Sequence, residues 1–280
     1  MHQIGLEEEK TLKKKLDGYF KKSRSLDLLD EKEKEEYEQN FKEASEIGGS
    51  KLAQYVFHRK YVLEILEKKL KLKLENKKKG YQYEEAIHNL IFPIRTTSDD
   101  LGYKDHNLWL IDERLTYQSY IASDKKFKKI PKVAIESEDR PDLICFRGPF
   151  TFSENEANQS SIVIIEFKRP GVDDFDQSGK SPVDQVIRYI KTLRSGDAKT
   201  KNGRPLAPEA ATPIFAYILC DEGKSIKNVI KDRDFRENPF GGAYYYHENQ
   251  NAYIEIIYYD KLVKDAKKRN KAFFDELNLS

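Results

Sequence analysis

Cysteine, methionine and tryptophan are scarce in this sequence of 280 residues, which contains two, one and one of them. The two cysteines, Cys145 and Cys220, lie far apart and form no Cys-x-x-Cys pair, so a zinc-thiolate site is not expected. Both fall in predicted strands, and we interpret them as buried thiols in a reducing compartment.

Long apolar runs and a secretory signal are also missing, so we expect a soluble, cytoplasmic protein that does not enter a membrane. The net charge is only +2, although 35% of the residues are charged. The positive excess lies in the first 80 residues, and the rest of the chain is close to neutral. A surface for nucleic acid would therefore have to come from a local patch. No Walker A motif, Rossmann glycine pattern or internal repeat is present.

The length allows one or two domains. Residues 1–80 are predicted to form a charged helical arm or linker, and residues 81–280 a folded domain. Within the arm, Gly48-Gly49-Ser50 indicates a break, with Ser50 as the N-cap of a helix over 51–77 that Gly80 ends. The helices of this arm could join copies of the chain or pack on a partner domain.

The hydrophobic pattern after residue 80 changes repeatedly between helical and strand periods, which predicts an α/β fold with a mixed central sheet flanked by helices. We expect helices over 81–91, 112–120, within 221–230, after Ser181 with Pro182 at the first position, and after the capping residue Asp260. We expect strands over 108–111, 142–146, 161–167 and 213–220, and a hairpin of 242–246 with 252–258.

Charged residues stand at the end of the β-branched run 161–165, which favours a buried strand. Glu166 and Lys168 are two residues apart, so both side chains point to one face, roughly 6.6 Å apart along the strand. Buried charges are costly unless something uses them, and a divalent metal would use the carboxylate. Asp142, after Pro141, begins a neighbouring strand, and antiparallel pairing would bring its carboxylate to Glu166 at one end of the sheet.

These residues carry a family resemblance. Pro141-Asp142 followed by Glu166-Phe-Lys168 resembles the PD-(D/E)xK pattern of nucleases, and Gln185-Val-Ile-Arg-Tyr189 is similar to the QxxxY motif of the RecB-type members. From about residue 84 onward, the chain also resembles a nuclease-like domain found beside GHKL-type ATPase modules in bacterial proteins. The segments that match are 88–93, 108–115 and 252–256, together with the two acidic segments. This sequence itself contains no such ATPase module.

The resemblance implies a restriction-endonuclease-like core and a metal-dependent nuclease that uses Mg²⁺ or Mn²⁺, with DNA as the expected substrate and anti-phage defence as the role. Asp142 and Glu166 would be metal ligands, with the carbonyl of Phe167 as a further one. Lys168 would orient or help to deprotonate the attacking water and stabilise negative charge. A glutamate of the first helix would complete the site. Glu84 is the first choice because it shares a helix face with the core residues of 87–91, and Glu85 is the alternative.

Nucleic-acid contacts are expected at Gln185 and Tyr189, which are four residues apart on one helix, and at Arg169. In the basic tract 125–129, Lys125 and Lys128 are candidates for contacts with the phosphate backbone, although an ordinary exposed loop is an equal interpretation. Homo-oligomers or an ATPase partner would use the N-terminal helices. The alternative function is a catalytically silent nucleic-acid-binding or oligomerisation module with the same fold.

Overall fold

The computed structural model describes residues 31–71, 80–118, 120–130, 135–147, 161–195 and 212–279. Residues up to 61 and from 272 belong to one compact unit, and residues 62–271 belong to a second. Helix α2 (Glu31–Lys71) contributes residues to both units. In the part of the chain that is described, no helix is long and apolar enough to cross a membrane.

The expected break at Gly48-Gly49-Ser50 is wrong, because α2 continues through these residues. Two exposed glycines cost a helix about 2 kcal/mol, and a helix that is already nucleated propagates cooperatively on either side of them. Gly80 does not end a helix either, since it is the first residue of helix α3 (Gly80–Ile91). The predicted end of the earlier helix, over 72–77, lies outside the described residues. In the first unit, Arg59 donates a hydrogen bond to the hydroxyl of Tyr55.

The second unit contains a seven-stranded sheet in the order β1-β2-β3-β4-β7-β6-β5. Strands β3, β4 and β7 are parallel, and the other neighbours are antiparallel, so the predicted mixed sheet of an α/β fold is confirmed. The strands are β1 (Tyr120–Ser123), β2 (Leu143–Arg147), β3 (Ser161–Phe167), β4 (Ile214–Cys220), β5 (Arg236–Glu237), β6 (Ala243–His247) and β7 (Ala252–Tyr258).

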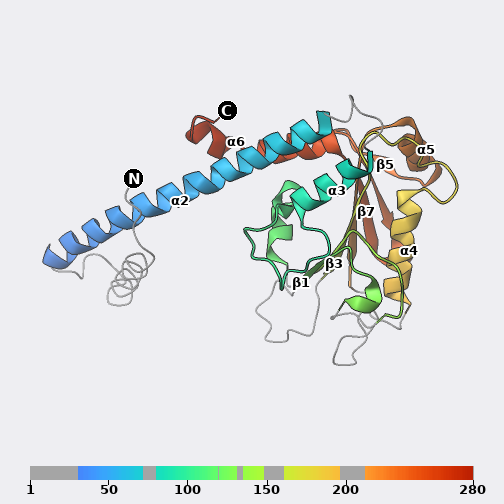
Figure 1. Ribbon diagram of the computed structural model, residues 1–280, viewed down its shortest axis with the longest axis horizontal. Coiled ribbons are helices and arrows are strands. Elements are labelled where there is room, and N and C mark those ends of the chain that lie inside the picture. The colour runs from blue at the N-terminus through green and yellow to red at the C-terminus, as the bar shows by residue number, and fades with distance from the viewer. Residues whose placement is uncertain are drawn as a thin grey trace. The chain divides into compact units, whose positions relative to one another are not determined.

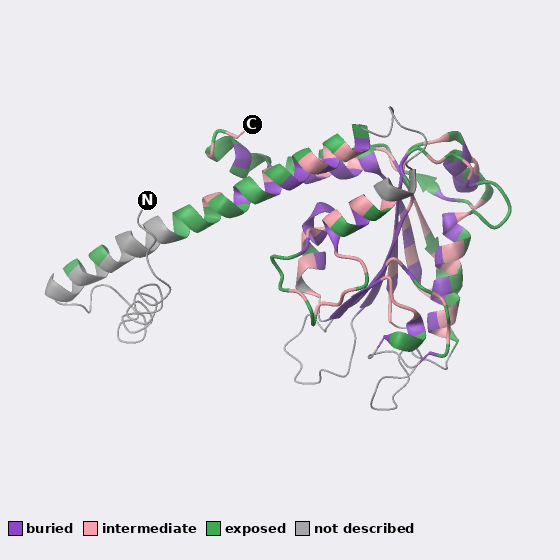
Figure 2. Ribbon diagram, in the orientation of Figure 1, coloured by how far each residue is buried: buried purple, intermediate pink, exposed green. Residues whose placement is uncertain are grey.

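Helices α4 (Pro182–Arg194) and α5 (Lys224–Asp232) cover one face of the sheet, and α3 lies over the other (Figure 1). Alternate residues of β3, such as Ile162 and Ile164, share a core cluster with the apolar residues of α4. Ser181 caps α4 by accepting the N–H of Asp184, as predicted. The central strands are almost entirely buried (Figure 2). Charges at their ends are therefore partly shielded from water.

The segment between α3 and β2 departs most from the predictions. The strand expected at 108–111 is the 3-10 helix η4 (Leu108–Leu110), and the helix expected at 112–120 is the 3-10 helix η5 (Glu113–Tyr117), followed by β1. All residues of η4 are buried, so burial alone could not distinguish the two structures. Two further 3-10 turns are η6 (Phe127–Lys129) and η7 (Glu248–Gln250).

The C-terminal helix α6 (Tyr259–Glu276) begins one residue before the expected cap, so Asp260 lies in its first turn. The hairpin of β6 with β7 and the buried positions of Cys145 and Cys220 agree with the sequence predictions. Because α6 follows β7 directly, its first turn lies at the same edge of the sheet as the end of β3. That edge contains the residues of the candidate site.

Candidate active site at the carboxyl edge of β3

Asp142 and Glu166 lie opposite each other at one end of the β2–β3 pair. The strands are antiparallel, as predicted, and Leu143 pairs with Ile165, so one further step in register sets Asp142 against Glu166. Directly opposite residues of antiparallel strands point to the same face. The N–H of Phe167 donates to Oδ2 of Asp142 at 2.7 Å and fixes that carboxylate on the neighbouring strand. The register therefore brings the two predicted acidic residues together.

Glu166 is the centre of a hydrogen-bonded group. Its Oε1 accepts from Nζ of Lys168 at 2.8 Å and from Nε2 of Gln185 at 2.6 Å. Nζ of Lys168 also donates to Oε1 of Gln185 at 2.8 Å, so the three side chains form a closed set. The other oxygen of Glu166, Oε2, is buried and has no hydrogen-bond partner among the described residues. A buried oxygen without a partner costs about 1–3 kcal/mol, and a bound ligand would remove that cost.

The two carboxylates perturb each other. Burial raises the pKa of Asp142 well above its ordinary value, and the charge of Glu166 raises it further. Burial also raises the pKa of Glu166, although the ammonium of Lys168 opposes this. Burial lowers the pKa of Lys168, but the charges of Glu166 and Asp142 outweigh it, so its pKa is raised. Lys168 is therefore a cation beside two carboxylates that resist ionising together.

Helix α3 brings a third carboxylate toward this edge. Glu84 is half-buried, and burial raises its pKa, while Lys168 lowers it and Glu166 raises it. Glu85, the alternative, is exposed. One turn further on, His88 stacks on the ring of Phe167 with 4.7 Å between the ring centroids. The contact places α3 over the strand that carries Glu166, and the charge of Glu84 on this helix couples to those of Lys168 and Glu166.

Two tyrosines hold the backbone on either side of the acidic pair. The hydroxyl of Tyr189 accepts from Gln185 at 2.7 Å and donates to the carbonyl of Arg140 at 3.1 Å. The hydroxyl of Tyr259 donates to the carbonyl of Lys168 at 2.6 Å. The sequence analysis did not identify Tyr259, and no local signal marks it, because it lies 91 positions after Lys168. Gln185 and Tyr189 thus act on the site itself, through Glu166 and the segment before Asp142.

The basic residues that were expected to contact nucleic acid are Arg169, Lys125 and Lys128. Arg169 is exposed directly after Lys168, and its charge acts on Glu84. Lys128 forms an ion pair with Glu138, and in the same tract Phe127 is fully buried within η6. The basic tract is thus a folded turn in which Glu138 offsets part of the positive charge. Neither Lys125 nor Lys128 forms an ion pair with Asp142, Glu166 or Glu84 within the described residues.

The side chains at this edge could supply some, but not all, of the ligands of a hard divalent cation. Across the described ranges, no group of three or more His, Cys, Asp or Glu side chains could hold a metal ion. Asp142 and Glu166 supply two carboxylates, one of them with the unpartnered Oε2. Mg²⁺ is often held by one or two carboxylates, with water and substrate phosphate completing its coordination. The residues present fit that mode of binding.

Comparison with protein-family models, with curated proteins and with solved structures gives no match. Support for a function therefore comes from the geometry of this edge and from the sequence motifs that it contains.

Proposed function

We propose that this protein is a metal-dependent nuclease of the PD-(D/E)xK type, with DNA as its substrate class and residues 81–280 as a nuclease-like domain with a restriction-endonuclease-like core. The order of elements supports the proposal, since a helix precedes three antiparallel strands, and α4 then leads to the parallel strand β4. A role as effector in bacterial anti-phage defence, with homo-oligomers or an ATPase partner engaged through the N-terminal helices, belongs to the same proposal. That part rests on the sequence resemblance.

The observation that carries the proposal is the unpartnered Oε2 of Glu166 beside Asp142, at the end of neighbouring strands. Asp142 and Glu166 would hold Mg²⁺ or Mn²⁺, with the carbonyl of Phe167 and the carboxylate of Glu84 as additional donors. When bound, the ion would lower the pKa of water and neutralise phosphate charge.

Lys168 has two conceivable roles, and its environment favours one of them. Its pKa is raised, so the ammonium form persists at neutral pH and does not accept a proton from water. We assign to it the stabilisation of negative charge on the attacked phosphate. Gln185 positions both Lys168 and Glu166 through hydrogen bonds of 2.8 and 2.6 Å. Arg169, which is exposed, would contact the nucleic acid at the edge of the site. Tyr189 was also expected to contact it, but this side chain is only 2% exposed and would act through Gln185 and the carbonyl of Arg140.

The test is cleavage of plasmid, linear duplex, single-stranded DNA and RNA with Mg²⁺ or Mn²⁺. Separate replacements of Asp142, Glu166 and Lys168 with alanine should each abolish cleavage and leave the fold intact by circular dichroism. Glu84→Ala should reduce cleavage, and Glu85→Ala on the same helix is its matched control. Undiminished cleavage by Asp142→Ala would contradict the assignment.

One observation favours the alternative, a catalytically silent module that binds nucleic acid or oligomerises. Lys168, Glu166 and Gln185 form hydrogen bonds with one another, as the members of a purely structural polar group would. Calorimetric titration with Mg²⁺ separates the two functions. The nuclease should bind the ion, and Asp142→Ala should not. A silent module should give no heat in either protein.

A further inference from the structure

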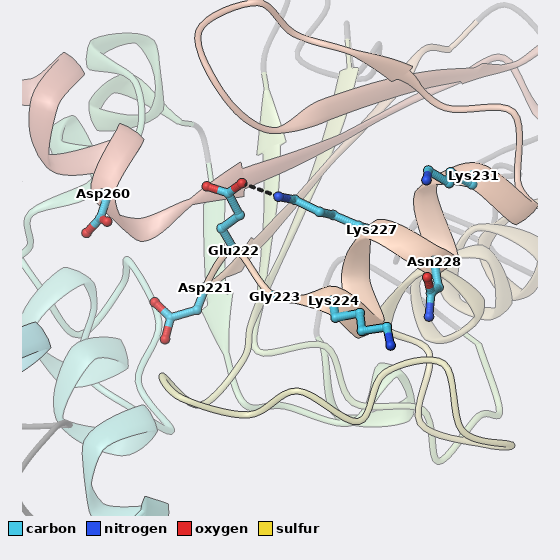
Figure 3. A pocket seen from close by; sticks show the side chains of 8 residues that line it. All are labelled: Asp221, Glu222, Gly223, Lys224, Lys227, Asn228, Lys231 and Asp260. Atoms are coloured by element: carbon cyan, nitrogen blue, oxygen red, sulfur yellow. Dashed lines mark ion pairs between the residues drawn. The ribbon is translucent and has the colours of Figure 1, made fainter.

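A polar pocket adjoins the candidate active site at the same edge of the sheet. Its volume is about 600 Å³. Asp221 follows β4 directly, and Asp260 lies in the first turn of α6, which follows β7. The pocket thus lies outside the carboxyl ends of parallel strands, where open α/β sheets commonly bind ligands. Its lining residues are Asp221, Glu222, Gly223, Lys224, Lys227, Asn228, Lys231 and Asp260 (Figure 3).

The loop that follows β3 joins the candidate site to the pocket. Lys168 donates its backbone N–H to the carbonyl of Leu219 at 2.8 Å, so its backbone lies beside the end of β4. Three residues later, the N–H of Gly171 donates to the carboxylate of Asp221 at 2.5 Å. Adjacent strands are about 4.8 Å apart, so the backbone of Lys168 lies about one strand spacing from the end of β4, which Asp221 of the pocket follows directly.

Positive charge gathers along one side of this pocket. Lys224, Lys227 and Lys231 are spaced three and four residues apart, so they share a face of α5. Lys227 pairs with Glu222 at 2.6 Å, whereas Lys224 and Lys231 form no ion pair with another described residue. Lys224 and Lys231 are seven residues apart in the helix, which corresponds to about 10 Å along the helix axis. Figure 3 shows the lysines along α5 and the acidic side chains of Asp221 and Asp260 away from it.

The N-terminus of α5 is not itself free for an anion. The carboxylate of Asp173 already accepts the backbone N–H groups of Lys224 and Ser225, at 3.2 and 2.6 Å. Asn228 donates its side-chain amide to Asp176 at 2.7 Å. The loop after β3 therefore fixes α5 at its first turns. The lysine ammonium groups, not the helix terminus, are the groups that could meet phosphates.

An exposed aromatic side chain lies at the same edge. Phe240 is 80% exposed, and it occupies the turn before β6. Two hydrogen bonds fix this turn. The N–H of Asn238 donates to the carbonyl of Gly242 at 2.9 Å, and the N–H of Phe240 donates to the side chain of Asn238 at 3.1 Å. Since Ala243 pairs with Ile256 near the end of β7, this turn lies beyond the carboxyl end of that strand. A large apolar ring held out into solvent on a fixed turn is suited to stacking.

We propose that the lysine face of α5 and Phe240 bind single-stranded nucleic acid and lead one unpaired strand to Asp142 and Glu166. This inference rests on the proposed nuclease function and names its substrate class. Phosphates lie at Lys224 and Lys231, and an unpaired base stacks on the ring of Phe240. Grooves that bind single strands combine these two elements, a positive track for the backbone and an aromatic ring for a base. A base inside a duplex is already stacked on its neighbours and cannot use Phe240.

The experiment measures binding by fluorescence anisotropy in EDTA, where no cleavage occurs. The probes are a labelled oligo-dT, an oligo-U of equal length and a duplex of the same length, which separate DNA, RNA and paired strands. Phe240→Ala should weaken single-strand binding by roughly 5- to 100-fold and leave duplex binding unchanged. Tyr103→Ala, which removes another exposed ring, is the control and should change neither.

The lysines are tested by salt dependence. Each phosphate contact contributes about 0.7 to the slope of log K against log salt for a single strand. The double variant Lys224→Gln/Lys231→Gln removes two such contacts and should therefore reduce the slope by about 1.4. The double variant Lys264→Gln/Lys268→Gln removes the same charge from exposed positions of α6 and should leave the slope unchanged.

Each result bears on only one of the two proposals. Cleavage that needs Asp142, combined with single-strand binding that is insensitive to Phe240→Ala, would overturn the inference and leave the nuclease proposal standing. Binding that depends on Phe240, combined with no metal-dependent cleavage, would overturn the nuclease proposal. The proposal that α5 and Phe240 bind single strands would still stand. Equal losses for single strands and duplex in Phe240→Ala would also refute the inference.

Discussion

Replacing Asp142 with asparagine should stabilise the fold while it abolishes cleavage. The pKa of Asp142 is raised in the folded protein, chiefly by burial and then by Glu166. The folded state therefore holds the proton more tightly than the unfolded chain does. The stability contributed by this group is complete below the unfolded pKa of about 3.9 and is lost as pH rises through the raised folded pKa. Asparagine cannot ionise, so it removes this loss.

The size of the gain follows from the strand register. Directly opposite residues of an antiparallel pair place their side chains about 5.5 Å apart. Two unit charges at that distance repel by about 3 kcal/mol at an effective dielectric constant of about 20. The ammonium of Lys168, at 2.8 Å from Glu166, offsets part of this repulsion. The asparagine oxygen can still accept the N–H of Phe167. We therefore expect Asp142→Asn to gain about 1–3 kcal/mol at pH 8.

The assay is urea unfolding of both proteins at pH 5 and pH 8, in EDTA. The gain should be larger at pH 8, and the control Asp99→Asn, which changes an exposed aspartate, should give no such gain. Saturating Mg²⁺ should stabilise the wild-type protein at pH 8 and leave Asp142→Asn unchanged. A variant that is less stable than the wild type at pH 8, or an equal gain at both pH values, would refute the reasoning.

Three further predictions concern the surroundings of the site. Tyr259→Phe removes the hydrogen bond to the carbonyl of Lys168, so it should cost about 1–2 kcal/mol in urea unfolding and lower kcat more than it changes KM. Gly242→Ala should cost more than about 2 kcal/mol, because φ is +83° and the added carbon would lie 2.2 Å from a carbonyl oxygen of β7. Gly179→Ala, with φ of +76° and open space around it, should cost only about 1 kcal/mol, and equal losses would contradict the steric argument. Burial lowers the pKa of His88 to about 4. Between about pH 6.5 and 4, the histidine is therefore protonated in the unfolded chain and neutral in the folded protein. The contribution of His88 to stability should therefore fall by about 2–3 kcal/mol between pH 7 and 4.5, and His88→Gln should be more stable than the wild type by a margin that grows toward pH 4.5.

Local patterns were sufficient for the parts of the fold whose causes lie within a few residues. A serine followed by proline predicted the start of α4, because the cap and the fixed φ act within one turn. The β-branched run predicted β3, and the position of Asp142 just before another strand predicted the meeting with Glu166. Asp142 and Glu166 are 24 residues apart in the sequence, and antiparallel pairing of their strands places them opposite each other. This part of the site could therefore be predicted from the sequence.

What the sequence by itself determined was thus the α/β class, the acidic pair and the Gln185–Tyr189 helix face. Only the tertiary structure decided that the charge of Glu84 couples to that of Lys168, that Glu138 pairs with Lys128, and that Tyr259 donates to the carbonyl of Lys168. It also decided that the buried segment Leu108–Leu110 is a 3-10 turn and not a strand. The physical reason is that a short apolar run is equally well buried in either form. Its conformation, like the partner of a charged side chain, depends on contacts with residues that are distant in the chain.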